Sequence, residues 1–262
     1  MKTILLLLYF GLSQCAYAQE QIPAKDPSES NFVALRADIK ALQTEQQLII
    51  TRLDELKQLL QGLGKPPATV ASTSVRDEPF RGNSVARVAI VEYADFECPY
   101  CGEFERQVFP KILSDYIETG KVKFFYRDLP LPGHPHALPA ARAARCAGEQ
   151  GKYWEMHDSL FAKQNSLSDS TLLERAKTLD LNSAKFAECQ AGEKYMADIQ
   201  NNISDARKMG IGGTPTFFLG VIEPNGDVTI EKRFQGSAPF DTFKSNLDAL
   251  LASDSQKASS TH

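Results

Sequence analysis

The chain has 262 residues, of which 42% are hydrophobic and 24% are charged. This composition resembles that of ordinary globular proteins and argues against a fibrous or wholly disordered chain. Lysine and arginine together number 29 against 33 acidic residues, a formal net charge of −4, which argues against a nucleic-acid-binding protein because such proteins usually present a basic face. The length allows one or two domains of about 100–200 residues each.

The first 18 residues have the pattern of a secretory signal peptide. Lys2 precedes the apolar run Ile4–Phe10, and the segment ends in Ala16-Tyr17-Ala18, which is typical of cleavage after Ala18. The apolar run is too short to span a bilayer. Lipidation of Cys15 is an alternative, although a glutamine precedes it where a small residue is expected. Export to the periplasm or a similar compartment leaves four of the five cysteines, and an oxidising environment favours their pairing.

Residues 31–62 show a heptad pattern that predicts a coiled-coil helix. Eight of the nine seam positions are apolar, and these positions alternate three and four residues apart: Phe32, Leu35, Ile39, Leu42, Gln46, Ile49, Leu53, Leu56 and Leu60. The polar segment 19–30 is expected to be a disordered leader, and the segment 63–76 a linker. Heptad and linker together favour a dimer or trimer through residues 32–60. A single amphipathic helix lying on its own domain is the alternative.

Residues 77–252 are expected to form one domain, followed by a flexible tail at 253–262. The predicted order is strand, helix, strand, a helical insert at about 136–209, two strands and a closing helix. Strands that flank a helix form a parallel pair through a right-handed crossover, and the last two strands form a hairpin around Asn225-Gly226. We therefore expect a mixed sheet with helices on its faces. The strands are predicted at 87–93, 121–127, 216–222 and 228–234, and the helices include 99–118, kinked at Pro110, and 239–251.

The motif Cys98-Pro99-Tyr100-Cys101 follows the first predicted strand and opens its helix. At a helix N-terminus, free backbone N–H groups and the helix dipole stabilise a thiolate, so Cys98 is expected to be the attacking or leaving sulfur. Cys101 lies one turn further on and is expected to be a shielded resolving thiol. The alternatives are a structural disulfide and half of a zinc site. The zinc site would need two more ligands, and the sequence has no second C-x-x-C motif.

The segment Gly212-Gly213-Thr214-Pro215 opens the third predicted strand. A proline at the start of a strand, after glycines, favours a cis peptide bond in a tight turn. Such a bond would turn the backbone of Thr214 outward, where an extended substrate could pair with it. An ordinary trans proline is the alternative.

The segments Glu92–Gly102 and Gly213–Phe217 together resemble DsbA-like thiol:disulfide oxidoreductases of the thioredoxin superfamily. Leu131–Pro135 and Ala140–Ala144 are similar to that family's helical insertion. The resemblance implies a thioredoxin fold of the α/β class with an inserted helical domain, here preceded by a long N-terminal helix. It also implies that Cys98 is the nucleophile, Cys101 the resolving cysteine and Pro215 the cis proline.

Three acidic residues surround the motif. Glu92 matches the buried acid that many thioredoxin-fold proteins place under the active site, where it would accept the proton of Cys101; a solvated carboxylate at the end of the strand is the alternative. Asp95 and Glu97 are expected to be exposed, where their negative charge would oppose formation of the Cys98 thiolate.

Cys146 and Cys189 fall in different predicted helices of the insert. Their separation and the expected export predict a second, structural disulfide, and two isolated buried thiols are the alternative. His134, His136 and His157 lack partners at metal-ligand spacing. The sequence has no haem or flavin motif, so we expect neither a cofactor nor a metal.

These features predict an exported oxidoreductase that forms disulfide bonds in secreted proteins through Cys98 and Cys101. Its partners would be unfolded or partly folded proteins that carry thiols, and a membrane redox partner would reoxidise it. Because oligomeric disulfide isomerases also combine self-association with this domain, an isomerase or reductase is the alternative. A non-catalytic oligomeric scaffold is a third hypothesis, which the intact cysteine motif disfavours.

Overall fold

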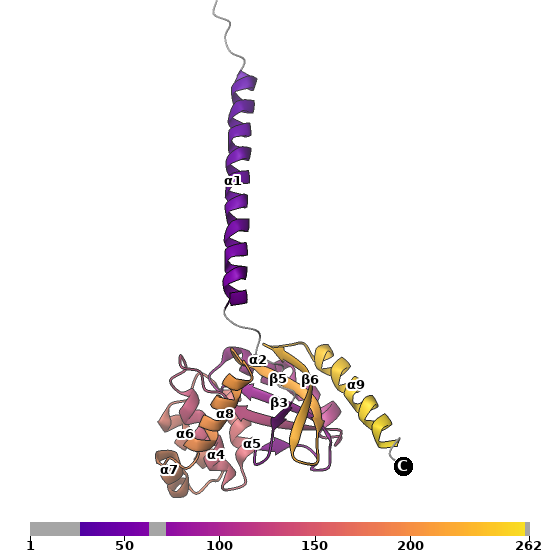
Figure 1. The fold of residues 1–262 in the computed structure, drawn as a ribbon. Coiled ribbons are helices and arrows are strands. Elements are labelled where there is room, and N and C mark those ends of the chain that lie inside the picture. Colours follow the sequence, from indigo (N-terminus) through magenta and orange to yellow (C-terminus); the bar gives the residue numbers. More distant parts are fainter. Residues whose placement is uncertain (1–26, 63–71, 260–262) are drawn as a thin grey trace, which may run out of the picture. The chain divides into compact units, whose positions relative to one another are not determined.

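The structure is a computed structural model that describes residues 27–62 and 72–259. The chain divides into two units, Met1–Lys65 and Pro66–His262; Figure 1 labels most of their helices and several strands. The predicted signal peptide and residues 19–26 of the predicted leader lie outside the described residues. Residues 63–71 of the predicted linker lie outside them as well.

The described part of the first unit is a 36-residue helix, α1 (Pro27–Gly62). It begins four residues before the predicted start, so the predicted leader is wrong for residues 27–30. Proline is well tolerated in the first turn of a helix because its missing N–H would have no partner there. The apolar seam residues whose side chains are described are 47% to 64% exposed: Phe32, Leu35, Ile39, Leu42, Ile49 and Leu53.

The second unit is built on a six-stranded sheet in the order β1-β6-β5-β3-β4-β2. The parallel pair β3–β4 and the antiparallel hairpin β5–β6 confirm the predicted mixed sheet. The hairpin turns at Gly226, whose φ of +82° lies in the left-handed region that favours glycine. The strands are β1 (Ser72–Ser74), β2 (Phe80–Arg81), β3 (Val88–Ala94), β4 (Val122–Asp128), β5 (Thr216–Ile222) and β6 (Asp227–Gln235).

Helices connect and cover these strands. The helix predicted over 99–118 is divided, because Pro110 cannot donate the hydrogen bond that a continuous helix requires. Between β4 and β5 lies the predicted helical insert, whose helices are gathered beside the sheet in Figure 1. The helices are α2 (Pro99–Gln107), α3 (Phe109–Ile112), the π-helix η1 (Leu113–Ile117), α4 (Ala137–Gly148), α5 (Tyr153–Ala162), α6 (Asp169–Thr178), α7 (Ser183–Ala191), α8 (Met196–Lys208) and α9 (Phe240–Ser259).

Two hydrophobic cores lie on opposite faces of the sheet. All seven residues of β3 are buried, and successive side chains of a strand point to opposite faces. Ile90 packs into the larger core, which includes Phe104 of α2 and Phe243 of α9. Val91 packs into the smaller core, which includes Met209 at the end of α8. Burial from both sides fixes the end of β3, from which the cysteine motif emerges.

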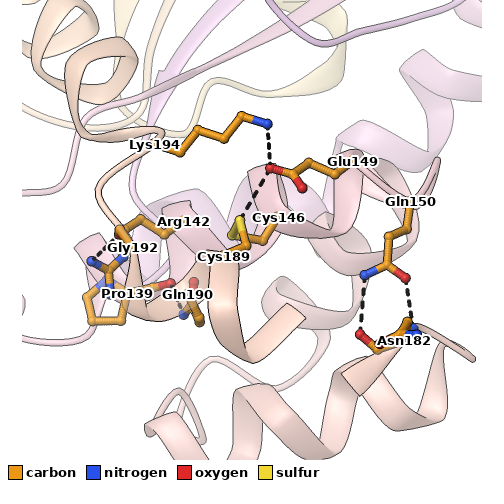
Figure 2. Close-up of a disulfide and its surroundings, with 10 residues drawn as sticks. All are labelled: Pro139, Arg142, Cys146, Glu149, Gln150, Asn182, Cys189, Gln190, Gly192 and Lys194. Atoms are coloured by element: carbon orange, nitrogen blue, oxygen red, sulfur yellow. Dashed lines mark hydrogen bonds and ion pairs between the residues drawn. A yellow bond between two sulfur atoms is a disulfide. The ribbon is translucent and has the colours of Figure 1, made fainter. Parts of the chain in front are cut away.

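A disulfide joins two helices of the insert. Cys146 of α4 and Cys189 of α7 are bonded, with their Cα atoms 5.8 Å apart, as the sequence predicted. Figure 2 shows a second link, between Gln150, two residues after α4, and Asn182, the N-cap of α7. Gln150 Nε2 donates to the carbonyl of Asn182 at 3.4 Å, and the N–H of Asn182 donates to Gln150 Oε1 at 2.8 Å. The disulfide and these two hydrogen bonds therefore join the same two segments of the insert.

Two predictions at the ends of this unit are wrong. Ser72–Ser74, expected in the linker, form the edge strand β1, which pairs antiparallel with β6. The closing helix continues through the predicted flexible tail to Ser259. The segment after Leu251 contains neither glycine nor proline, so no residue in it breaks the helix. In both cases a short polar segment extends a neighbouring element, by pairing with β6 at one end and by continuing α9 at the other.

Candidate active site

Cys98 caps the N-terminus of α2, four residues after β3 ends at Ala94. Its backbone is extended, with φ −70° and ψ 123°, and Pro99 begins the helix, which suits proline's fixed φ. Cys98 is 3% exposed and Cys101 is fully buried, whereas Tyr100 between them is 61% exposed. Both cysteines are free thiols. Of the two, only Cys98 retains exposure to solvent.

The surroundings of Cys98 favour its thiolate. Its pKa is lowered to about 6, first by a hydrogen bond from the Cys101 thiol and further by backbone hydrogen bonds from Cys101 and Tyr100, while burial opposes the shift. These N–H groups are the unpaired donors of the first helical turn. The geometry therefore supplies the thiolate stabilisation that the sequence predicted for this position.

The surroundings of Cys101 have the opposite effect. Burial raises its pKa well above the usual value, and its hydrogen bond to Cys98 and the nearby charge of Glu92 raise it further. A thiol that donates to a neighbouring sulfur loses that bond when it ionises, so the two cysteines cannot both be good thiolates. The pair is therefore divided into one reactive sulfur and one shielded sulfur.

The Thr214–Pro215 peptide bond is cis, and it lies against the cysteine motif. The Sγ of Cys98 lies 3.4 Å from the carbonyl oxygen of Thr214, to which the thiol donates. The N–H of Gly236, just after β6, donates to the carbonyl of Pro215 at 2.8 Å. Strand β5 and its neighbour thus bring Thr214 and Pro215 to Cys98 over more than a hundred residues of sequence.

Glu92 is a fully buried acid in β3, rather than a solvated carboxylate. Neither of its oxygens has a hydrogen-bond partner among the described residues. Burial raises its pKa well above the usual 4.5, and the charges of Glu105 and Cys98 add to the effect. Glu92 therefore keeps its proton to a higher pH than an exposed glutamate does, which suits a group that exchanges a proton with a thiol.

Two further titratable groups with buried side chains, Glu105 and His157, lie near the cysteine motif and were not predicted from the sequence to do so. Glu105 lies in α2, seven residues after Cys98, and burial raises its pKa well above the usual value. His157 of α5, named in the sequence only as a residue without metal partners, has its Nε2 3.9 Å from Glu105 Oε1 and its Nδ1 3.0 Å from Asp158 Oδ1. The seven-residue spacing places Glu105 on the same side of the helix as Cys98, and this is the signal that could have identified it.

The prediction that Asp95 is exposed is wrong. Asp95 is 1% exposed, because its carboxylate turns inward to bind the segment between β4 and α4. Oδ2 accepts the N–H of Leu131 at 2.8 Å and lies 2.7 Å from His134 Nδ1. Glu97, predicted to be exposed as well, is half-buried, and its Oε2 accepts the N–H of His136 at 2.7 Å. Both acids tie the cysteine motif to one loop.

Gln164 is another functional neighbour that the sequence did not indicate. From the loop after α5, its Nε2 donates to the carbonyls of Phe96 at 2.9 Å and Cys98 at 2.8 Å. A Cβ atom added to Gly102 would lie only 1.7 Å from Gln164 Oε1 and would collide with it. Gly102 therefore makes room for the side chain that holds the turn before α2. The packing of the insert against this turn could not be inferred from spacing along the chain.

Comparison with known proteins agrees with this geometry. A family model described as thioredoxin matches residues 74–234. The chain belongs to the thioredoxin family. Within it, the solved structure of α-DsbA1 from Wolbachia pipientis is similar, with a TM-score of 0.61 and 32% identity over 70% of this chain and 95% of that one. The thioredoxin fold predicted from the sequence, with its helical insert, is thereby confirmed.

Two curated relatives extend the comparison. Disulfide bond formation protein D of Bacillus subtilis is 29% identical over 190 residues, which are 64% of this chain and 82% of that protein. The Na⁺/H⁺ antiporter NhaA 3 of Salinispora tropica is 43% identical over 152 residues, 58% of this chain. This chain spans 23% of the antiporter's length, so the similarity concerns one part of it. Among the described residues, no helix is long and apolar enough to cross a membrane.

Proposed function

We propose that this protein is an exported thiol:disulfide oxidoreductase that forms disulfide bonds in secreted proteins through Cys98 and Cys101. The observation that supports this most directly is the opposite environment of the two sulfurs. The pKa of Cys98 is lowered to about 6 by hydrogen bonds from Cys101 and the helix backbone, whereas burial raises that of Cys101 well above its usual value. Because Cys98 is the better leaving and attacking sulfur and Cys101 is shielded, thiol exchange with a substrate should take place at Cys98.

The oxidising cycle starts from the Cys98–Cys101 disulfide. A substrate thiolate attacks Cys98, the Cys98–Cys101 bond breaks, and Cys101 leaves and takes up a proton, which Glu92 is placed to supply. A second substrate thiolate then attacks the substrate sulfur of the mixed disulfide. Cys98 leaves as a thiolate, the substrate gains a disulfide, and the cysteine pair holds the two electrons. A membrane redox partner must remove them to restore the disulfide.

The substrate is expected to pair with the backbone of Thr214. This residue lies beside Cys98, whose Sγ lies 3.4 Å from the Thr214 carbonyl. An extended peptide with a cysteine could then align by main-chain hydrogen bonds, as in other strand additions, without a specific side-chain sequence. This supports a broad range of unfolded proteins as substrates.

The test is substitution of each cysteine in turn. Cys98→Ser should abolish oxidation of a reduced, unfolded protein substrate. Cys101→Ser should trap mixed disulfides with the disulfide-bonded form of that substrate, because Cys98 attacks the substrate disulfide, one substrate sulfur leaves as a thiolate, and the resolving thiol is missing. Full activity of the Cys98→Ser protein, or trapping by Cys98→Ser rather than Cys101→Ser, would show that the roles are assigned wrongly. Sequencing the N-terminus of protein exported by a bacterial host tests the proposed cleavage after Ala18.

An oligomeric isomerase or reductase is the second candidate, and the exposed seam of α1 is the observation that favours it. Several cysteine pairs gathered by a coiled coil could hold a misfolded substrate, provided that Cys98 and Cys101 are kept reduced. Equilibrium with glutathione and reactivation of a scrambled disulfide protein separate the candidates. A strongly oxidising pair without reactivation supports the oxidase, and reactivation that depends on α1 supports the isomerase.

A further inference from the structure

The loop between β4 and α4, residues 129–136, is fastened to the turn that carries Cys98. Asp95 forms the centre of this fastening. Its Oδ1 accepts the N–H of Glu97 at 2.7 Å, and its Oδ2 accepts the N–H of Leu131 at 2.8 Å and lies 2.7 Å from His134 Nδ1. The side chain of Asp95 is 0% exposed and that of His134 is 26% exposed. Asp95 therefore holds the loop at Leu131 and His134, while part of the His134 imidazole remains exposed to solvent.

The hydrogen bond to Asp95 determines which ring nitrogen of His134 is the donor. A carboxylate only accepts hydrogen bonds, so Nδ1 carries a proton and the second proton of the imidazolium resides on Nε2. Burial raises the pKa of Asp95, while its three hydrogen bonds oppose this effect. An ionised carboxylate without exposure needs a compensating charge, and the imidazolium of His134 supplies it.

His134 also belongs to the electrostatic surroundings of Cys98. Burial by itself would lower the pKa of His134, but the hydrogen bond to Asp95 and the charges of Asp95, Cys98 and Glu97 outweigh it, so the pKa is raised. The effect of Cys98 is reciprocal, because two linked ionisations favour one another equally. A positive His134 therefore favours the Cys98 thiolate.

The motif between the cysteines supplies no such charge. Pro99 and Tyr100 are both uncharged, so a cation near Cys98 must come from another part of the fold. Asp95 links the two residues: its carbonyl accepts the N–H of Cys98 at 3.1 Å, and its Oδ2 lies 2.7 Å from His134 Nδ1, so one residue holds both the backbone of Cys98 and the imidazole.

We propose that His134 is the cation of this active site, held by Asp95 as a positioning residue, and that its positive charge stabilises the Cys98 thiolate. The inference rests on the proposed function, because it takes Cys98 as the nucleophile. A stabilised thiolate favours the reduced state of the pair, and this makes the disulfide a stronger oxidant. The contribution is present when His134 is protonated and is lost as the pH rises through the pKa of His134.

The test is a titration of thiolate absorbance in the reduced mature protein. His134→Gln should raise the measured pKa of Cys98 by about 0.5 to 1, as expected for loss of one nearby opposite charge. His136→Gln is the matched control, because its side chain lies exposed on the same loop, and it should leave the curve unchanged. Circular dichroism verifies that both variants are folded. A His134→Gln curve that superimposes on that of the parent overturns the inference.

A reciprocal measurement separates this inference from the proposed function. Observed by NMR, the ring of His134 should lose its proton at lower pH in the Cys98→Ser protein than in the reduced parent. An unchanged titration of the ring overturns the inference while leaving Cys98 as the nucleophile. If instead the thiolate absorbance of the parent is unchanged in the Cys98→Ser protein, Cys98 is not the reactive thiolate and the proposed function itself fails.

Discussion

Glu92 and Cys101 are buried neighbours whose negative forms oppose one another, because the charge of Glu92 raises the pKa of Cys101. Glu105 extends this relationship, since its charge raises the pKa of Glu92 in addition to the larger effect of burial. The region beneath the active-site helix therefore resists the accumulation of negative charge. When Glu105 or Glu92 loses its proton, the new negative charge raises the pKa of its neighbour, which then holds its own proton more tightly.

Burial of Glu92 should make the folded protein less stable as the pH rises. Its pKa is raised above 4.5 on folding, so the unfolded chain releases this proton first, and stability falls between 4.5 and the higher folded value. The slope is about 1.4 kcal/mol per pH unit for one group. Glu92→Gln should therefore be more stable than the parent at about pH 8, with a gap that closes toward about pH 4. Urea unfolding at several pH values measures this.

Glu118→Gln provides the control for that series, since Glu118 is exposed and its replacement should change stability by less than about 0.5 kcal/mol. A constant difference between Glu92→Gln and the parent across the pH range would contradict the prediction. Glu92→Gln should also slow formation of the mixed disulfide by about tenfold or more, because Cys101 then leaves without the acid that protonates it.

Cys98 should affect the stability of the reduced protein in the opposite direction. Its pKa falls from 9.0 to about 6 on folding, so between these values the unfolded chain retains a proton that the folded chain has released. The reduced parent should therefore gain stability relative to Cys98→Ser from about pH 6 upward, at up to about 1.4 kcal/mol per pH unit, and the gain should level off near pH 9. Parallel stability curves for the two reduced proteins would contradict this.

The disulfide between Cys146 and Cys189 should stabilise the insert without taking part in exchange. It closes a segment of 43 residues, and the loss of chain entropy in the unfolded state predicts a contribution of about 4 kcal/mol. The double variant Cys146→Ser/Cys189→Ser should unfold at lower denaturant concentration and still oxidise a substrate at low temperature. Unchanged stability, or complete loss of exchange in the folded variant, would show that the bond has another role.

The exposed seam of α1 predicts self-association of the mature protein. Burying a leucine or isoleucine side chain contributes about 1.5–3 kcal/mol, and this gain is available from a second copy of the helix. Leu42→Asp/Ile49→Asp should shift the mass measured by light scattering to that of a monomer. Thr44→Asp/Thr51→Asp is the matched control, because these exposed residues lie outside the seam.

Removal of residues 19–65 should likewise give a folded monomer that retains thiol exchange, since the cysteine site lies wholly in the second unit. A parent protein that is monomeric at micromolar concentration would exclude the coiled coil. It would also remove the main support for the isomerase.

The sequence was sufficient for those parts of the site that depend on local order. Cys98 follows a buried strand and begins a helix, and Pro215 follows glycines at the start of another strand, so each motif carries its own geometric signal. The four central strands and the hairpin could be predicted for the same reason, because periodicity and turn residues are local, whereas the short edge strands β1 and β2 were not predicted. The cis Thr214–Pro215 bond was expected from such a signal, whereas the Cys146–Cys189 disulfide was expected from the separation of the two cysteines and from export; both are present in the structure.

The remaining parts depend on contacts between distant segments. Asp95 looked like a surface residue because charged groups near a turn are usually solvated, and only the return of Leu131 and His134 to the end of β3 explains its burial. Gln164 is similarly ordinary in sequence, and its contacts with Phe96 and Cys98 arise only when the insert packs. Such roles follow from folding rather than from any pattern along the chain.

The position of Gln164 has a consequence for how this domain could be rebuilt. The amide that holds the carbonyls of Phe96 and Cys98 belongs to the helical insert, so the reactive turn borrows part of its support from a segment that a minimal thioredoxin framework would omit. Excising the insert would remove this donor from both carbonyls and leave that of Cys98 with the N–H of Gly102 alone. The insert therefore supports the turn that carries Cys98. If the insert were exchanged for that of a relative, Gln164 would have to be retained, and Gly102 with it, because a side chain at that position would collide with the glutamine.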